Sequence, residues 1–479
     1  MNSKRIISLI CAVVLLFSMF SIPASANSRA QVWSGTDANG VVFRDGDVPI
    51  QVESELLTFD LPTLPYVKYR DAESFLAYDS KVTAEYTFYN PTDMTITATL
   101  LFPFGTCPEY AYYSQKYAAD ELDRHGVYVN GEKINADVRY TDYSSFSFNT
   151  DEHLATLSDE FIVDDFYTPD LTVTKYSYEI VGQKSKSAYF NIEVASLGKD
   201  RVIVLKNGRL GGHIKDNGNF SMSDSSADEN EKLTVFFYVL GRPLTTPPAA
   251  GWYERNGTAP DTKTDGKFTY LGTESSTLRD FIFNEYDAAR GVSEVDWYNA
   301  CIANIKSKEV VQGTTRAIRS LYFGSLMRWY EYEITLQPGE KIKNTVTAPM
   351  YPQIEAWDQP YEYNYTYLLS PASGWADFGR LDIVINTPYE MSETNLEGFE
   401  KTENGYRLTR DGLPTDENGY IDLHFTLLND GNTPKEQPNP NKVKGFFERA
   451  GEVIASFFII VFMAIVSVLK WIVELFIAK

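Results

Sequence analysis

The chain has 479 residues, of which 43% are hydrophobic and 23% charged, and its formal net charge at pH 7 is -22. So acidic a protein repels phosphate backbones and anionic lipid headgroups, which argues against nucleic-acid binding and leaves divalent cations and basic partners open. Its three cysteines are too few for a fold built on disulfides. The length is enough for roughly two or three domains.

The N-terminus has the pattern of a secretory signal. Lys4 and Arg5 precede an apolar run over residues 6–20, and small residues follow at 24–26. A positive start, an apolar centre and a small-residue cleavage site are the three parts of a signal peptide. We therefore expect residues 1–26 to be removed and the following chain to be exported.

The C-terminus carries a second apolar segment. Residues 453–469 have no charged side chain, which is close to the minimum for a helix that spans a bilayer. We expect a Pro- and Asn-rich stalk over 430–445 and a membrane anchor over 446–479, with a helix lying in the membrane interface as the alternative. The residues expected to contact lipid are Val453, Ile454, Phe457, Leu469 and Trp471. This arrangement predicts a single-pass protein of the cell membrane with an extracellular N-terminal ectodomain.

The N-terminal half of the expected ectodomain has the pattern of β structure. Residues 82–88 and 96–102 alternate apolar and polar side chains around a turn at 90–93, which predicts a hairpin. A second hairpin is predicted around Asn130-Gly131, the pair that type I′ turns favour. Further strands are expected over 172–180, 188–194, 202–205 and 233–240.

The C-terminal half begins with helices and returns to strands. Apolar side chains at helical spacing predict two helices, over 278–286 and 293–305. Strands are expected from Trp329 onward, including 361–367, 381–385 and 421–427. The predicted fold is mainly β, with two sandwich-like domains, a short two-helix insertion and a C-terminal transmembrane helix. The expected boundaries are 27–250 for an N-terminal β-rich domain, 251–328 for the helical insertion and 329–429 for a C-terminal β-sandwich.

The strand patterns resemble those of an uncharacterised family of exported bacterial proteins, which pair a signal peptide with an N-terminal β-domain of unknown function. The resembling segments are Gly40-Val41-Val42-Phe43, 52–56, 82–90, 101–104, 336–340 and 365–375. The resemblance implies an exported bacterial β-protein. It offers no catalytic residue to transfer.

The usual catalytic motifs are missing from the sequence. The four histidines, His125, His153, His213 and His424, have no zinc-site spacing, and there is no Gly-x-Ser-x-Gly elbow or phosphate-binding loop. Cys107 with His125 could form a nucleophile and its base, but a strand end is the simpler interpretation. Cys107 and Cys301 could form one disulfide or remain separate thiols. We therefore expect no enzyme.

Two groups of residues are candidate binding sites. The aromatic side chains Tyr361, Tyr363, Tyr365 and Trp375 could form a platform on which a glycan stacks, the alternative being ordinary sheet packing. Oxygen ligands for Ca²⁺ are offered by Asp416, Asn418 and Asp422, and by Asp37, Asn39, Asp45 and Asp47. Neither acidic group matches the EF-hand template, and turns between strands are the alternative.

These observations favour a membrane-anchored envelope protein of bacteria that acts as a binding or structural module. Its expected partners are the membrane and either a surface glycan or a membrane protein, without nucleic acid. No cofactor is expected apart from Ca²⁺. Two alternatives remain open, a carboxylate-based hydrolase of surface glycans and a subunit of a membrane protein complex.

Overall fold

The computed structural model describes residues 32–33, 38–44, 48–69, 72–108, 110, 123–143, 150–195, 200–205, 209–215, 217–225, 227–256, 259–307, 326–357, 359–369, 372, 374–416 and 419–429. The expected signal peptide, stalk and anchor lie outside these ranges, as do the lipid-contacting residues predicted within the anchor. Within the described ranges, no helix is long and apolar enough to cross a membrane.

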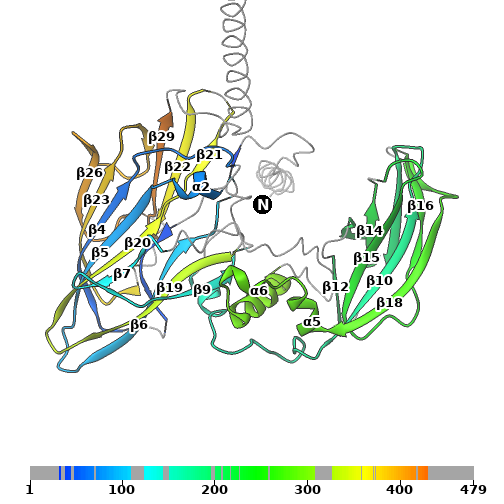
Figure 1. The fold of residues 1–479 in the computed structure, drawn as a ribbon, viewed down its shortest axis with the longest axis horizontal. Helices are drawn as coiled ribbons and strands as arrows, with labels where there is room; N and C mark the ends of the chain where they lie inside the picture. Colours follow the sequence, from blue (N-terminus) through cyan, green and yellow to red (C-terminus); the bar gives the residue numbers. More distant parts are fainter. Residues whose placement is uncertain are drawn as a thin grey trace, which may run out of the picture.

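The protein is mainly β, as predicted, and Figure 1 shows two separate groups of strands with a pair of helices between them. The larger group is formed by residues 32–143 and 326–429, which we call the split domain. The smaller group lies within residues 150–307, which we call the inserted domain.

One layer of the split domain is an eight-stranded sheet. Its order is β25 (Glu400–Thr402), β26 (Gly405–Asp411), β23 (Phe378–Asn386), β4 (Gln51–Asp60), β5 (Lys81–Tyr89), β20 (Lys341–Pro349), β7 (Gly126–Val129) and β8 (Glu132–Ile134). Strands β4 and β23 are parallel neighbours, although more than 300 residues separate them. The N-terminal and C-terminal parts of the chain therefore share one sheet.

Two further sheets of the split domain pack on the same hydrophobic core. One contains β1 (Val32–Trp33), β21 (Gln353–Glu355), β22 (Tyr361–Leu368), β29 (Leu423–Asn429) and β24 (Glu390–Thr394), with β2 (Ala38–Asn39) beside β22. The other contains β3 (Val42–Phe43), β6 (Ile96–Gly105), β19 (Leu326–Leu336) and β9 (Asp137–Asp142). The short pair β27 (Thr415–Asp416) and β28 (Gly419–Tyr420) and the helix α2 (Ala72–Leu76) complete this domain.

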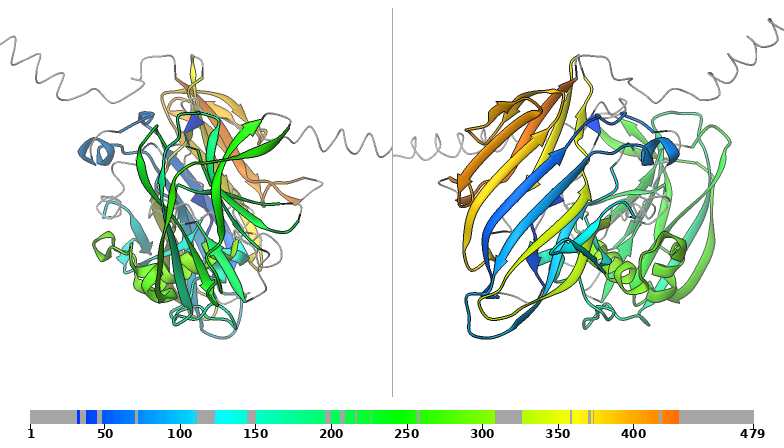
Figure 2. Two further views of the ribbon diagram at one scale, coloured as in Figure 1. Left: turned by 90° about the vertical axis from the view of Figure 1, so that its right-hand side faces the viewer. Right: turned by 60° about the vertical axis from the view of Figure 1, so that its left-hand side comes forward.

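The inserted domain has two sheets around a core of its own. The first contains β12 (Arg201–Val204), β15 (Lys232–Gly241), β10 (Thr172–Val181) and β18 (Phe268–Thr277). The second contains β13 (Gly211–Ile214), β14 (Phe220–Asp224), β11 (Ala188–Val194), β16 (Ala249–Asn256) and β17 (Ala259–Thr264). Figure 2 shows these strands beside the split domain.

Strand pairing corrects the predicted domain boundaries at 250 and 329. Segments assigned to different domains pair in one sheet, as β4 does with β23, so there is no separate C-terminal sandwich over 329–429. The insertion instead runs from the end of β9 to the start of β19, where Asp142 and Leu326 are paired neighbours. The alternation of apolar and polar residues predicted the strands. It did not predict their pairing, because the partner strands are distant in sequence.

The hairpin predicted across residues 90–93 is also wrong. Both strands exist, but β5 pairs with β4 and β20, whereas β6 pairs with β3 and β19. The buried Asn90 lies at the crossing between layers, and its side-chain amide donates to the carbonyls of Leu336 and Gln337 at 3.2 and 3.1 Å. The hairpin at Asn130-Gly131 is confirmed, because both residues have positive φ and join the paired strands β7 and β8.

The predicted helix pair is confirmed as α5 (Leu278–Phe283) and α6 (Glu294–Ser307), beside the short helices α4 (Thr150–Leu154) and η2 (Ala288–Arg290). The apolar faces of α5 and α6 pack with Val173 and Leu240 of the inserted sheet and with Tyr140 and Leu326 of the split domain. The helices are therefore the packing layer between the two domains.

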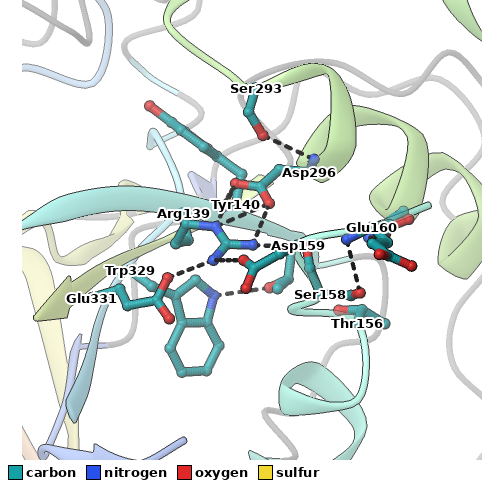
Figure 3. A network of polar contacts seen from close by, with 12 residues as sticks. Arg139, Tyr140, Thr156, Ser158, Asp159, Glu160, Ser293, Asp296, Trp329 and Glu331 are labelled. Carbon is teal, nitrogen blue, oxygen red and sulfur yellow. Dashed lines mark hydrogen bonds and ion pairs between the residues drawn. The ribbon is translucent and has the colours of Figure 1, made fainter. Parts of the chain in front are cut away.

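An ion-pair network, centred on Arg139 of β9 and buried at Asp296, crosses the same junction (Figure 3). The Arg139 guanidinium donates to Asp296 of α6 at 3.0 and 3.1 Å, to Glu331 of β19 at 2.5 Å and to Asp159 at 3.2 Å. The Asp296 side chain has no exposed surface and also accepts from the Tyr140 backbone N–H at 3.1 Å. Arg44 contacts Glu331 and Asp159, which closes the network.

Replacing Arg139 by alanine would leave the carboxylate of Asp296 buried without its cation. We expect Arg139→Ala to lower the free energy of unfolding by about 3 kcal/mol or more, the usual cost of breaking a buried pair. The control is Arg242→Ala, which removes an exposed pair with Asp200 and should cost no more than about 1 kcal/mol. Urea denaturation of the full chain measures both, and equal losses would contradict a structural role for the network.

Candidate functional site

The aromatic platform predicted from β22 is wrong. Tyr361, Tyr363, Tyr365 and Trp375 are at most 6% exposed and face the core of the split domain. The Tyr365 ring stacks on Phe425 with centroids 5.0 Å apart, and Trp375 stacks on Phe88 at 4.6 Å. Side chains that fill the space between two sheets cannot stack on a glycan.

Of the predicted calcium ligands, the structure describes only the side chain of Asp422. Asn418 and the side chain of Asp416 lie outside the description, as do Asp37, Asp45, Asp47 and the side chain of Asn39. Asp422 accepts a hydrogen bond from the backbone N–H of Leu369 at 2.8 Å. Where the structure describes the chain, it contains no group of three His, Cys, Asp or Glu side chains arranged to hold a metal ion.

The cysteine and histidine considered as a nucleophile and base are both buried, Cys107 at 7% and His125 at 5% exposure. Burial, together with the smaller effect of the neighbouring cations Arg124 and Arg328, lowers the pKa of His125 to about 3. The imidazole is therefore neutral at physiological pH. Both side chains are therefore largely withdrawn from solvent.

A polar surface lies on the opposite side of the strand that carries the buried tyrosines. Register places Gln353, Asn364, Thr426 and Glu393 opposite one another on β21, β22, β29 and β24. We call these four residues the polar row. They cross four strands, a length of about 14 Å at the usual strand spacing.

The polar row borders a groove of about 330 Å³. The side chains that line it are Asn364, Thr366, Glu393, Thr394, Asn395, His424 and Thr426. They are joined across the strands, because Thr426 donates to Asn364 at 2.7 Å and the Thr366 hydroxyl lies 3.0 Å from Nδ1 of His424. The backbone N–H of His424 donates to Asn395 at 2.8 Å. The groove is therefore a surface of ordered hydroxyl, amide and imidazole groups.

An irregularity in β24 completes the row. The pairing of β24 with β29 shifts between Met391 and Glu393, so that Glu393 rather than Ser392 lies opposite Thr426. A β-bulge of this kind changes which side of the sheet a side chain faces. The bulge therefore places an exposed carboxylate at the end of the row.

The surface next to the polar row is acidic. Glu355, Glu362 and Glu390 occupy the neighbouring register positions on β21, β22 and β24, and Leu428 lies between them on β29. Asn364 and Gln353 both donate to Glu355, at 3.3 and 3.1 Å. Among the described side chains that line the groove there is no lysine or arginine. An anionic ligand would thus meet like charge.

A second pocket, of about 470 Å³, lies where the parallel strands β4 and β23 both end. It is lined by Asp60, Leu61, Pro62, Asp79, Lys81, Asn386, Thr387, Pro388, Glu403 and Asn404. Asn386 donates to Asp60 at 2.8 Å, and Lys81 lies 4.0 Å from the same carboxylate. We call this the end pocket, and it brings three carboxylates to one opening.

Glu55 of β4 is a buried carboxyl group inside the split domain. It is 1% exposed, and neither of its carboxylate oxygens has a partner in hydrogen-bonding geometry. A bulge between Val52 and Ser54 shifts the alternation of β4 and turns Glu55 inward. Burial raises the pKa of Glu55 to about 7, and the nearby Tyr86 hydroxyl, which favours the ionised form, opposes this rise only in part.

A carboxyl whose pKa is raised on folding stabilises the protein at low pH and ceases to do so as the pH rises through the folded value. For Glu55 this contribution is complete below about pH 4.5 and lost above about pH 7, a change of about 3 kcal/mol. We expect Glu55→Gln to remove this loss and to be the more stable form at pH 8. Chemical denaturation of both proteins between pH 4.5 and 8 measures it, with the exposed Glu333→Gln as control. The same pH dependence in Glu55→Gln and the parent protein would contradict the assignment.

Comparison with known proteins places the chain in no family. No protein-family model matches the sequence, and no curated protein matches it. Among solved structures, the crystal structure of a "putative nutrient binding protein" from Legionella pneumophila is similar at 9% identity and a TM-score of 0.28, over 83% of this chain and 72% of that chain. A likeness at this level carries no argument about function.

The sequence pattern selected β22 as a candidate binding strand, but the aromatic side that it selected faces the core. The tyrosines and the polar residues Asn364 and Thr366 alternate along the same eight residues. The aromatic residues were predicted to form the binding surface because aromatic rings commonly stack on sugars. The signal that could have identified the groove is the polar set of the same alternation, together with His424 and Thr426 on the paired strand.

Proposed function

We propose that this protein is a membrane-anchored, extracellular protein of the bacterial envelope, and that it binds an envelope ligand in the groove beside the polar row. Export and anchoring are supported by the two apolar ends of the sequence. Binding is supported by one observation above all, the ordered polar side chains that line an open groove on the outer side of β22 and β29.

The groove has the properties that recognition needs. Its side chains are held by cross-strand hydrogen bonds, so little conformational freedom is lost when a ligand arrives. It lies on paired strands whose inner face is packed in the domain core, which keeps the groups at fixed spacing. A concave surface with a few convergent polar groups is the usual form of a binding site.

The end pocket favours a second candidate function. Asp60, Asp79 and Glu403 surround a larger opening, and paired carboxylates are the machinery of glycoside hydrolysis. We propose the end pocket as the site of the hydrolase alternative. Its activity would appear as soluble reducing ends released from a glycan, and Asp60→Asn should abolish that release.

We expect the full-length protein in detergent to sediment with purified envelope polymer of the producing bacterium. His424→Ala removes a side chain from the groove and should weaken this binding about fivefold, the effect of losing one ordinary hydrogen bond. The matched control is His213→Ala, which removes an exposed histidine from β13 of the inserted domain. The fraction of protein that sediments, measured as a function of polymer concentration, gives the affinity of each variant.

Two outcomes would contradict the proposal. The first is failure of the parent protein to sediment with the polymer. The second is an equal loss for the two histidine variants. Release of reducing ends that depends on Asp60 would instead favour the hydrolase.

A further inference from the structure

We propose that the groove takes a neutral, polyhydroxylated glycan chain that lies across the strands, along the polar row. This inference rests on the proposed binding function and adds the chemical class and direction of the ligand. It is drawn from the hydrogen-bonding capacity, charge and direction of the described side chains.

The hydrogen-bonding capacity of the groove is mixed and only partly used. Thr426 gives its hydroxyl proton to Asn364, so the Thr426 oxygen can still accept from a ligand. The Asn364 amide donates one of its two protons to Glu355 and keeps the other. Sugar hydroxyls both donate and accept hydrogen bonds. They can therefore satisfy the remaining donors and acceptors of the groove, which a ligand that only donates or only accepts cannot do.

Charge excludes anionic polymers. Glu393 ends the polar row, and Glu355, Glu362 and Glu390 lie one register position away on the same outer side. Among the described residues none of these glutamates forms an ion pair, and the described groove lining includes no lysine or arginine. A phosphate, sulfate or uronate group would meet uncompensated negative charge, whereas a neutral sugar would not.

The direction of the row argues against a peptide. An extended peptide usually binds by joining the open edge of a sheet, where backbone groups are unpaired. The polar row instead crosses β21, β22, β29 and β24 on their side-chain surface, and β22 and β29 are paired on both sides. A ligand there must be recognised by the side chains of successive strands over about 14 Å, which suits a short oligosaccharide segment.

The test uses the full-length protein in detergent and calorimetric titration with defined probes. The neutral probes are β-1,4-linked hexasaccharides of glucose and of N-acetylglucosamine, the anionic probe is a hexamer of galacturonic acid, and the peptide probe is a Ser/Gly decamer. We expect binding of at least one neutral hexasaccharide and none of the peptide. The galacturonate hexamer should bind at least fivefold more weakly than the neutral sugar.

Two variants locate the ligand. The double variant Thr366→Val and Thr426→Val keeps the side-chain shape but removes both hydroxyls, and should weaken neutral binding at least tenfold. Its matched control is Thr335→Val, because Thr335 forms an equivalent exposed hydroxyl pair with Thr97 on β19 and β6 at 3.0 Å. Glu393→Gln is the second variant. By removing a negative charge from the groove, it should raise affinity for the galacturonate hexamer about fivefold relative to affinity for the neutral hexasaccharide.

The outcomes separate this inference from the proposed function. Sedimentation with envelope polymer that depends on His424, together with no binding of any neutral probe, would overturn the glycan assignment and leave the binding function standing. Preferred binding of the anionic hexamer or of the peptide would overturn it as well. If the double valine variant does not fold, the response of Glu393→Gln to the anionic probe decides the question alone.

Discussion

The split domain depends on one long-range interaction, the parallel pairing of β4 with β23. Residues 52–60 and 378–386 meet in register at the centre of the eight-stranded sheet. Their neighbours on either side then assemble the layer against which the sheet of β22 and β29 packs. Gly379 shows how close the approach is, because a Cβ atom there would lie 2.3 Å from the carbonyl oxygen of Glu53. This pairing therefore joins the two halves of the chain in the layer on which the sheet that carries the groove packs.

Sequence pattern predicted the strands well and their partners poorly. The alternation over 82–88, the turn at Asn130-Gly131 and the helices at 278–307 all depend on neighbouring residues, so local physics was enough to find them. The domain boundaries and the hairpin at 90–93 depend on which distant strand is the partner. Packing of whole layers decides that choice, and no short segment carries the information.

The candidate site illustrates the same limit on a smaller scale. Alternation along β22 separates tyrosines from polar residues, but it does not say which set faces the core. The tyrosines face the core because burying a large aromatic ring is far more favourable than burying a threonine or asparagine side chain. Bulges then moved two glutamates to positions that regular alternation does not predict, Glu55 into the core and Glu393 into the groove.

The junction around Arg139 and the groove at β22 lie on different sheets of the split domain, so the inserted domain can be held by one while the other stays open to a ligand. The outer side of β22 and β29 is the proposed binding surface. A crystal structure of the protein soaked with a neutral hexasaccharide tests it most directly. We expect sugar density across Asn364 and Thr426, whereas density in the end pocket with an empty groove would contradict binding at β22 and β29.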